Sequence, residues 1–308
     1  MSDGIVRILV PVVVLLVAVQ IVTGILLAMH YVPSEQPVLT SSGLPGTIVH
    51  ADHVLIWRAS PEAWPDTLAM PGDHALVPAG RTAIVPSEAG ASVALTIHHQ
   101  VPGGAVLRTI HHVVTPILVV AAFLLVIVWM FGRRAFQGAW RWYAVLASLV
   151  LTMAAAYSGR LLPDDVYAAT SRAVVGHAME EAPFGAILSV GLGLAGTLAT
   201  SYAMHALVIP LFLSAIVCLL LRSTVRSWRP AFVIVVVVTL AVALTPVSWM
   251  APRDVLHGAN AGYEGGPWWI FVPFEVLEDV AGAELGGYLV IIVAALLLSL
   301  PFRKRAGA

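Results

Sequence analysis

The chain has 308 residues, of which 59% are hydrophobic and only 11% are charged, and its mean hydropathy is +0.91. Soluble domains are about 45–50% apolar and about 25% charged, so this composition indicates an integral membrane protein in a lipid bilayer. The net charge of −1 argues against nucleic acid as a partner, and a single cysteine, Cys218, excludes an internal disulfide and a cysteine-ligated iron–sulfur cluster.

Long apolar runs predict the membrane-spanning helices. A bilayer core of about 30 Å needs about 20 apolar residues in a helix. Five runs meet this length or come close to it, at 8–29, 113–131, 143–157, 231–250 and 285–302. A sixth run, 182–221, is uncharged and longer than one span requires, so it fits either one helix with a non-helical lead-in or two helices joined by a tight turn.

The distribution of charge favours a single crossing in 182–221, because Lys and Arg are retained on the cytoplasmic side. Six spans then gather most basic residues on one side, namely Arg7, Arg133, Arg134, Arg141, Arg222, Arg226, Arg229, Arg303, Lys304 and Arg305. Nearly all acidic residues fall on the other side. We therefore expect an all-α integral membrane protein, a transmembrane bundle of six spans with both termini cytoplasmic, in a bacterial inner membrane.

The segment between the first two spans is polar and long. Residues 35–90 are rich in Pro, Gly, Ser and acidic groups, and they include His50, His53 and His74. A pair such as His50 and His53 suggests a metal site, but solvated loop histidines are the simpler interpretation. Because loops on a rigid scaffold often carry recognition, this outer insert is predicted to be a docking surface for an extracytoplasmic partner.

Two histidines stand out inside the predicted membrane region. His111 lies near the outer end of the second span and His205 near the outer end of the fourth. Histidine is costly in hydrocarbon, which makes each a candidate functional residue. At similar depth on facing helices, two neutral imidazoles suit the axial positions of an iron macrocycle. The alternative is that each histidine caps a helix end or bonds to neighbouring backbone.

Short motifs accompany these histidines along the chain. They are Gln20-x-x-Thr23-Gly24 with Tyr31-x-Pro33; Ala91-Ser92-Val93; Gly104-x-x-x-Arg108-x-x-His111; Gly159-x-x-Leu162-Pro163-x-Asp165 with Pro183-x-Gly185; Thr197-Leu198 with His205; and Pro267-Trp268-Trp269-Ile270-Phe271-Val272-Pro273 with Leu285-Gly286-Gly287. In order and spacing they resemble the cytochrome b subunit of cytochrome bc complexes, the quinol oxidases of respiratory and photosynthetic membranes. The family pattern at Gly159 is G-Y-x-L-P-W-D.

The resemblance implies a cofactor site and a division of the chain. Residues 1–222 would form a haem-binding four-helix bundle that carries the insert 35–90, and 223–308 a two-helix part resembling the family's quinol-site region. One haem b would lie on the outer side with His111 and His205 as axial ligands to iron. Arg108 would hold a haem propionate or a helix end, and Gly24 would let the macrocycle approach the first helix. Gln20 and His112 complete the predicted cofactor-binding set.

The chain departs from the family where a second haem and the quinol pocket are expected. The family has another histidine fourteen residues after each first one, about 21 Å deeper, and here these positions are Leu125 and Leu219. The family's Glu in P-E-W-Y is Trp268. Quinone-site candidates are Pro267, Trp268, Trp269 and Phe271, and candidates for the proton acceptor are Glu275, Glu278 and Asp279.

The predicted function is that of a single-haem membrane subunit in a larger electron-transfer complex. It would exchange electrons between the quinone pool and an outer-side partner, a cytochrome c or an iron–sulfur protein, alongside other membrane subunits. The alternative is a degenerate membrane anchor that keeps the fold and scaffolds other redox subunits without turnover. The replacement of the family's Glu by Trp268 favours the anchor, whereas a histidine pair at matched depth favours the haem protein.

Overall fold

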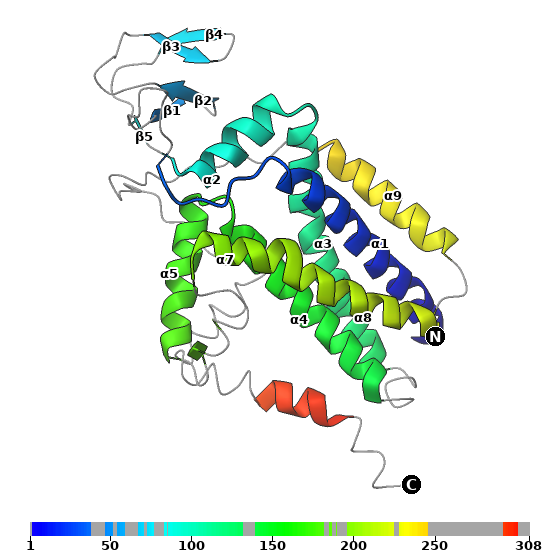
Figure 1. Ribbon diagram of the computed structural model, residues 1–308. Coiled ribbons are helices and arrows are strands. Elements are labelled where there is room, and N and C mark those ends of the chain that lie inside the picture. Colours follow the sequence, from blue (N-terminus) through cyan, green and yellow to red (C-terminus); the bar gives the residue numbers. More distant parts are fainter. Residues whose placement is uncertain are drawn as a thin grey trace, which may run out of the picture.

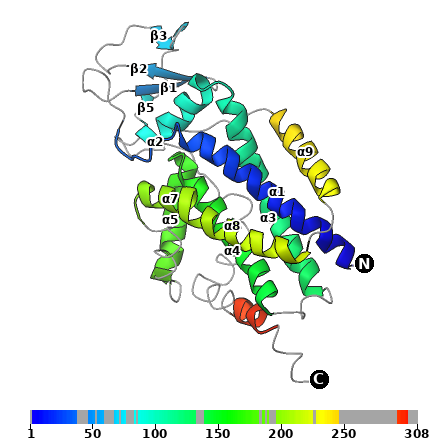
Figure 2. The same ribbon diagram turned by 45° about the vertical axis from the view of Figure 1, so that its right-hand side comes forward.

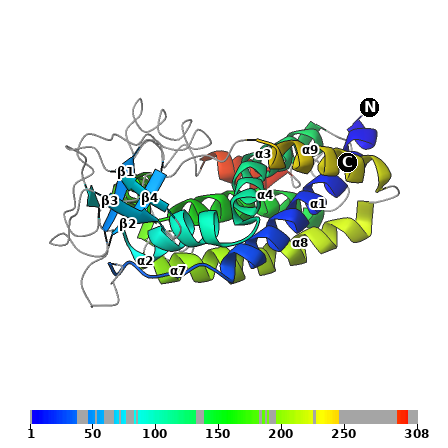
Figure 3. The same cartoon turned by 90° about the horizontal axis from the view of Figure 1, so that it is seen from above.

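The computed structural model describes residues 2–37, 47–51, 54–58, 67–70, 73–76, 83–84, 86–131, 139–181, 185–186, 189, 196–224, 228–245 and 292–300. Long helices run side by side along most of the molecule (Figure 1). Short strands gather at one end, and the N-terminus lies toward the other (Figure 3). These are called the strand end and the N-terminal end below.

Four helical segments are long and apolar enough to cross a membrane, at Gly4–Ala28, Gly104–Phe131, Ala139–Leu161 and Leu198–Leu221. The first three belong to α1 (Ser2–Ala28), α3 (Gly104–Phe131) and α4 (Ala139–Leu161). The fourth is a continuous helix made of α7 (Leu198–Ala203), a π-helical turn η3 (Met204–Val208) and α8 (Ile209–Thr224). It begins at Leu198 because the Thr197 side chain accepts a hydrogen bond from the Thr200 N–H as an N-cap.

The remaining two predicted spans are represented only in part. The run 231–250 contributes α9 (Arg229–Ala243), a shorter apolar helix that packs along α1 and α3 (Figure 2). Of the run 285–302, the described part is a helix at 292–300. Its backbone is tied to the start of α4, because Trp142 Nε1 donates to Leu297 O at 2.8 Å. Six spans and cytoplasmic termini remain predictions.

The strand end contains structure that an all-α prediction lacks. Strands β1 (Thr47–Ala51), β2 (Val54–Arg58) and β5 (Ala83–Ile84) form an antiparallel sheet in the order β2-β1-β5, and β3 (Thr67–Met70) pairs with β4 (Asp73–Leu76). Strands β1 and β2 are rich in Val, Ile and Thr, whose branched side chains favour extended backbone. His50 lies in β1 and His74 in β4, whereas His53 falls outside the described residues.

Three helices complete the strand end. The four-residue α2 (Glu88–Ala91) continues into the π-helix η1 (Ser92–Gln100), which leads to α3. Helix α5 (Val166–Glu181) follows α4 after a short turn. The turn is fixed at both ends, because Tyr31 Oη donates to Leu162 O at 2.7 Å and Ala168 N–H donates to Asp165 Oδ1 at 2.8 Å.

The N-terminal end of the bundle is a solid apolar core. Trp129, Trp142, Leu16, Leu125 and Leu220 are each at most 2% exposed there, and the indole rings of the two tryptophans are among the largest fully buried groups. Fourteen residues of regular α-helix would return Leu219 nearly to the face of His205, but the Leu219 side chain is 47% exposed. The π-turn η3 adds a residue to one turn of the helix and so rotates the residues beyond it, which brings Leu220 to the inward face instead.

Candidate cofactor site

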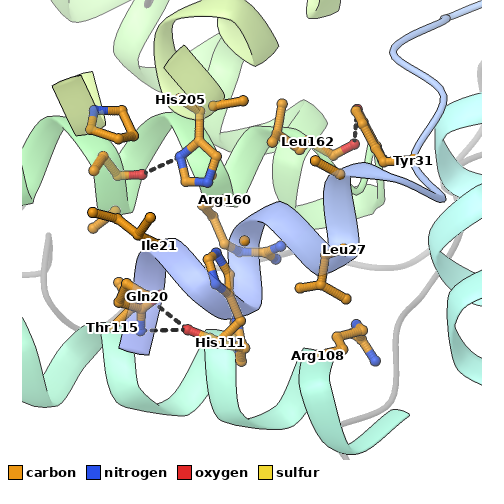
Figure 4. Close-up of a pocket in the computed structure, with 18 of the residues that line it drawn as sticks. Gln20, Ile21, Leu27, Tyr31, Arg108, His111, Thr115, Arg160, Leu162 and His205 are labelled. Atoms are coloured by element: carbon orange, nitrogen blue, oxygen red, sulfur yellow. Dashed lines mark hydrogen bonds between the residues drawn. The ribbon is translucent and has the colours of Figure 1, made fainter. Parts of the chain in front are cut away.

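A cavity opens between α1, α3, α4 and α7–α8 toward the strand end of the bundle. Its volume is about 300 Å³, at the lower end of the range for small-molecule sites. Most of its walls are apolar side chains of the four helices. The groups that give it chemical character are two histidines that face one another, His111 and His205, together with charged side chains at one edge (Figure 4).

The two imidazole rings have the spacing of axial ligands. Their centroids are 6.0 Å apart, and the ring planes meet at 82°. A metal–imidazole bond of about 2 Å on each side, plus about 1 Å from each nitrogen to its ring centre, separates two axial rings by about 6 Å. The described part of the chain holds no group of three or more His, Cys, Asp or Glu side chains placed to bind a metal ion. Two imidazoles alone suit a metal that brings its own equatorial ligands.

Hydrogen bonds fix which nitrogen of His111 faces the cavity. The Thr23 hydroxyl donates its proton to Val19 O at 2.8 Å, so its oxygen accepts from His111 Nδ1 at 2.9 Å. Nδ1 therefore carries the proton, and Nε2 keeps the lone pair that a metal requires. The backbone behind the ring is also braced, because Gln20 Nε2 at 3.0 Å and Thr115 Oγ1 at 2.7 Å both donate to His111 O.

His205 is held in the same tautomer from the other side of the bundle. Its Nδ1 lies 2.9 Å from Ala155 O, a carbonyl that only accepts, so Nδ1 donates. The Ser158 hydroxyl lies 3.3 Å from the same nitrogen and gives its own proton to Ala154 O at 2.8 Å. In both histidines Nδ1 is thus engaged by the helix that packs behind the ring, which leaves Nε2 with the lone pair that a metal requires.

Two glycines make room for the histidine rings. A Cβ added at Gly24 would lie 3.1 Å from His111 Cε1, and one at Gly159 would collide with the ring of His205. Gly24 therefore makes room for the His111 ring itself, whereas the sequence-based expectation was that it makes room for a macrocycle. Gly159 belongs to the Gly-x-x-Leu-Pro motif, but sequence reasoning did not assign it to the site. Its signal in the sequence is a hydroxyl-bearing neighbour, since Ser158-Gly159 repeats the arrangement of Thr23-Gly24 on a second helix.

Charged groups collect at one edge of the cavity. The lining includes Arg108 and His112, two of the residues that the sequence predicts to bind the cofactor, and also Arg160 and Asp165. Arg160 Nη1 lies 3.1 Å from Asp165 Oδ2, and its guanidinium carbon lies 5.1 Å from the centre of the Tyr167 ring. In Figure 4 the guanidinium groups of Arg108 and Arg160 lie on the Leu27 side of the histidine pair, away from Thr115.

Two tyrosines, one just beyond the first span and one within the fourth, add polar groups to the cavity wall. Tyr31 and Tyr202 line the cavity with their rings 5.2 Å apart, and burial raises the pKa of Tyr31 well above its ordinary value. On η1, His98 and His99 form an edge-to-face pair with centroids 4.5 Å apart. Burial, followed by the neighbouring charges of His99 and Arg108, lowers the pKa of His98.

The predicted quinone-site residues lie outside the described residues. These are Pro267, Trp268, Trp269 and Phe271, together with the carboxylates Glu275, Glu278 and Asp279. The six residues that the sequence predicts to bind the cofactor all line this cavity: Gln20, Gly24, Arg108, His111, His112 and His205. With a matched donor pair, a fixed tautomer on each side and a glycine beside each ring, the residues present fit a planar iron macrocycle.

Comparison with known proteins supports the fold. No family model matches the chain, and no curated protein matches it. Among solved structures it is similar to a chain described as "Hyperthermophilic respiratory Complex III", with a TM-score of 0.62 and 17% sequence identity. The alignment covers 98% of this chain and 74% of that chain. At this identity the similarity shows a shared fold.

Proposed function

We propose that the chain is a membrane subunit of a respiratory or photosynthetic electron-transfer complex and that it binds one haem b between His111 and His205. The observation that carries the proposal is the geometry of this pair, 6.0 Å apart with Nδ1 of each ring engaged by the protein. The resemblance to cytochrome b and the fold shared with a chain of a respiratory complex III point to the same class of protein.

The residues of the chain would hold and orient the haem at such a site. When bound, the haem supplies a one-electron couple at its iron. His111 and His205 would hold the iron through Nε2. Their Nδ1–H groups donate to fixed acceptors, which would raise the basicity of both ligands. Apolar walls from four helices exclude water, and small residues beside each ring let the histidines stand close to the helices behind them.

The packing of the other half of the bundle supports a single haem. Trp129 and Trp142 fill the N-terminal end together with Leu125 and Leu220, the inward positions of α3 and α8. Side chains of this size, buried to 2% or less, occupy the region into which a second macrocycle would have to fit. A subunit of this design would handle electrons at one side of the membrane only.

The partners follow from the resemblance. The haem would exchange electrons with quinone or quinol, and with a cytochrome c or iron–sulfur protein docked on the outer side of a bacterial inner membrane. We expect Pro267, Trp268, Trp269 and Phe271 to contribute to the quinone site, with Glu275, Glu278 or Asp279 as proton acceptor. Other membrane subunits would complete the complex, and the outer insert 35–90 would meet the extracytoplasmic partner.

The test is a haem count and a reduction assay on the purified full chain with its co-purifying subunits. We expect one protohaem per chain by pyridine haemochrome, and loss of the haem in both His111→Leu and His205→Leu. His99→Leu, which changes an exposed histidine beyond the cavity, is the matched control. Retention of a six-coordinate haem in both cavity variants would refute the assignment.

The same preparation separates the two candidate functions. Reduction of the haem by an added quinol supports the electron-transfer subunit. A stoichiometric haem that is indifferent to quinol, or no haem at all, supports the degenerate anchor, the alternative that the replacement of Glu by Trp268 favours.

A further inference from the structure

Arg160 is a cavity residue that neither the resemblance nor the proposed function explains. The cytochrome b pattern has tyrosine at this position, between the Gly and the Leu-Pro that this chain shares. Here an arginine follows Gly159, the glycine that makes room for the His205 ring, and lines the same cavity. The Arg160 side chain is 13% exposed, so its charge is held largely away from water.

The contacts of Arg160 hold it from one side. Its Nη1 atom reaches both carboxylate oxygens of Asp165, at 3.3 and 3.1 Å, so these two bonds use a single nitrogen. A guanidinium has five N–H donors in a planar fork that matches a carboxylate. The guanidinium carbon lies over the Tyr167 ring, 5.1 Å from its centre. The contacts with Asp165 thus leave the other edge of the fork for a further acceptor.

Asp165 does not serve Arg160 alone. Its Oδ1 also accepts from Ala168 N–H at 2.8 Å, in the first turn of α5. Arg108 interacts electrostatically with both Asp165 and Arg160. Among the described residues that line the cavity, these are the charged ones, two cations and one anion. An excess of positive charge at a largely buried edge favours an anionic ligand group there.

We propose that Arg160 binds a carboxylate on the edge of the macrocycle beside the one assigned to Arg108, so that the cavity selects a macrocycle with two acidic side chains. The inference deepens the proposed function and rests on it. Both guanidinium groups lie on the same side of the histidine pair in Figure 4, where the edge of a plane held between the two rings would emerge. Asp165 is then a positioning residue that shares Arg160 with the ligand.

The experiment compares protohaem with its dimethyl ester, in which both carboxylates are masked. The full chain is prepared without haem and loaded with either compound. The dissociation constant of the ester divided by that of the free acid is the selectivity ratio, and it measures selection for the acid. Wild type is expected to prefer the free acid. Arg160→Gln should lower that ratio about tenfold, since a charge-assisted hydrogen bond contributes on the order of one decade or more in affinity.

Two further variants separate ligand binding from a purely structural role. Asp165→Asn keeps an acceptor for the Ala168 N–H but releases Arg160, so the ratio should stay or rise. Arg172→Gln is the matched control, because Arg172 pairs with Asp164 and Glu35 in the same region and does not line the cavity. The haem midpoint potential gives an independent sign: it should fall in Arg160→Gln, which removes a cation, and rise in Asp165→Asn.

Each result decides the inference. A selectivity ratio that is unchanged in Arg160→Gln, or that Arg172→Gln lowers equally, would overturn it. So would a ratio in Asp165→Asn that falls as far as the ratio in Arg160→Gln. If Arg160→Gln does not fold, Asp165→Asn and the conservative Arg160→Lys still test it, since Lys keeps the charge and should retain part of the preference. Failure of the proposed function is distinct, because wild type would then bind neither compound.

Discussion

Replacement of Thr23 by Val tests whether the tautomer of His111 is what makes it a ligand. Val has nearly the same shape as Thr but lacks the hydroxyl that accepts from His111 Nδ1 at 2.9 Å. Thr23 is 6% exposed, so water does not readily replace the lost acceptor. A buried donor left unsatisfied costs about 1–3 kcal/mol, and loss of such a supporting bond lowers metal affinity about 10–100-fold.

The measurement is the rate at which haem leaves the detergent-solubilised full chain for an excess of a haem-binding acceptor. We expect Thr23→Val to release haem about 10–100-fold faster than wild type. Thr115→Val is the matched control: it also loses a hydroxyl beside His111, but His111 O still accepts from Gln20. Equal release rates for Thr23→Val and wild type, or for the two variants, would refute the argument that Nδ1 support determines affinity.

Three other expectations rest on the same geometry. Gly159→Ala should abolish haem binding, because the added Cβ collides with the His205 ring, and Gly24→Ala should only weaken it, because its Cβ lies 3.1 Å from His111. Haemochrome titration measures the haem bound by each variant. A smaller loss of haem in Gly159→Ala than in Gly24→Ala would contradict the order. Ring planes at 82° should give a strongly anisotropic low-spin ferric signal in electron paramagnetic resonance, whereas a moderately rhombic one would mean parallel rings. Burial lowers the pKa of His98, so its neutral form stabilises the fold above about pH 6.5, and this contribution is lost as the pH falls through the lower folded pKa. His98→Gln should therefore reduce the fall of the melting temperature at acid pH. A melting temperature with the same pH dependence as in wild type would count against this.

Much of the site could be predicted from residue type and spacing. Apolar runs located the long helices, and histidine at matched depth in two of them marked a candidate donor pair, because a histidine within the membrane is a functional hypothesis by default. The family resemblance added Arg108 and Gly24. What it did not supply was the local cause of each role: Gln20 holds the backbone at His111, and Gly24 gives space to the ring.

Other features escaped sequence reasoning for physical reasons. Arg160 lies at the end of a span, where arginine is ordinary at a membrane interface, so nothing in the sequence marked it as facing a cavity. The strands at 47–84 were missed because the segment was judged by its polar composition, although Val54 to Arg58 has strand-forming residues. The π-turn at 204–208 has no evident signature in residue type, and it invalidated the fixed spacing from His205 to Leu219.

The π-turn also explains how one helix can serve both ends of the bundle. His205 lies within it, facing a cavity bordered by glycine and small hydroxyl side chains, whereas Val217 and Leu220 beyond it pack into the core with Trp129. A regular helix would carry the histidine face into the core without rotation. The extra residue turns α8 relative to α7, so the cofactor face and the packing face are set separately. Removal of one residue from the turn should therefore disturb either the donor pair or the core, and the haem count and the melting temperature together identify which.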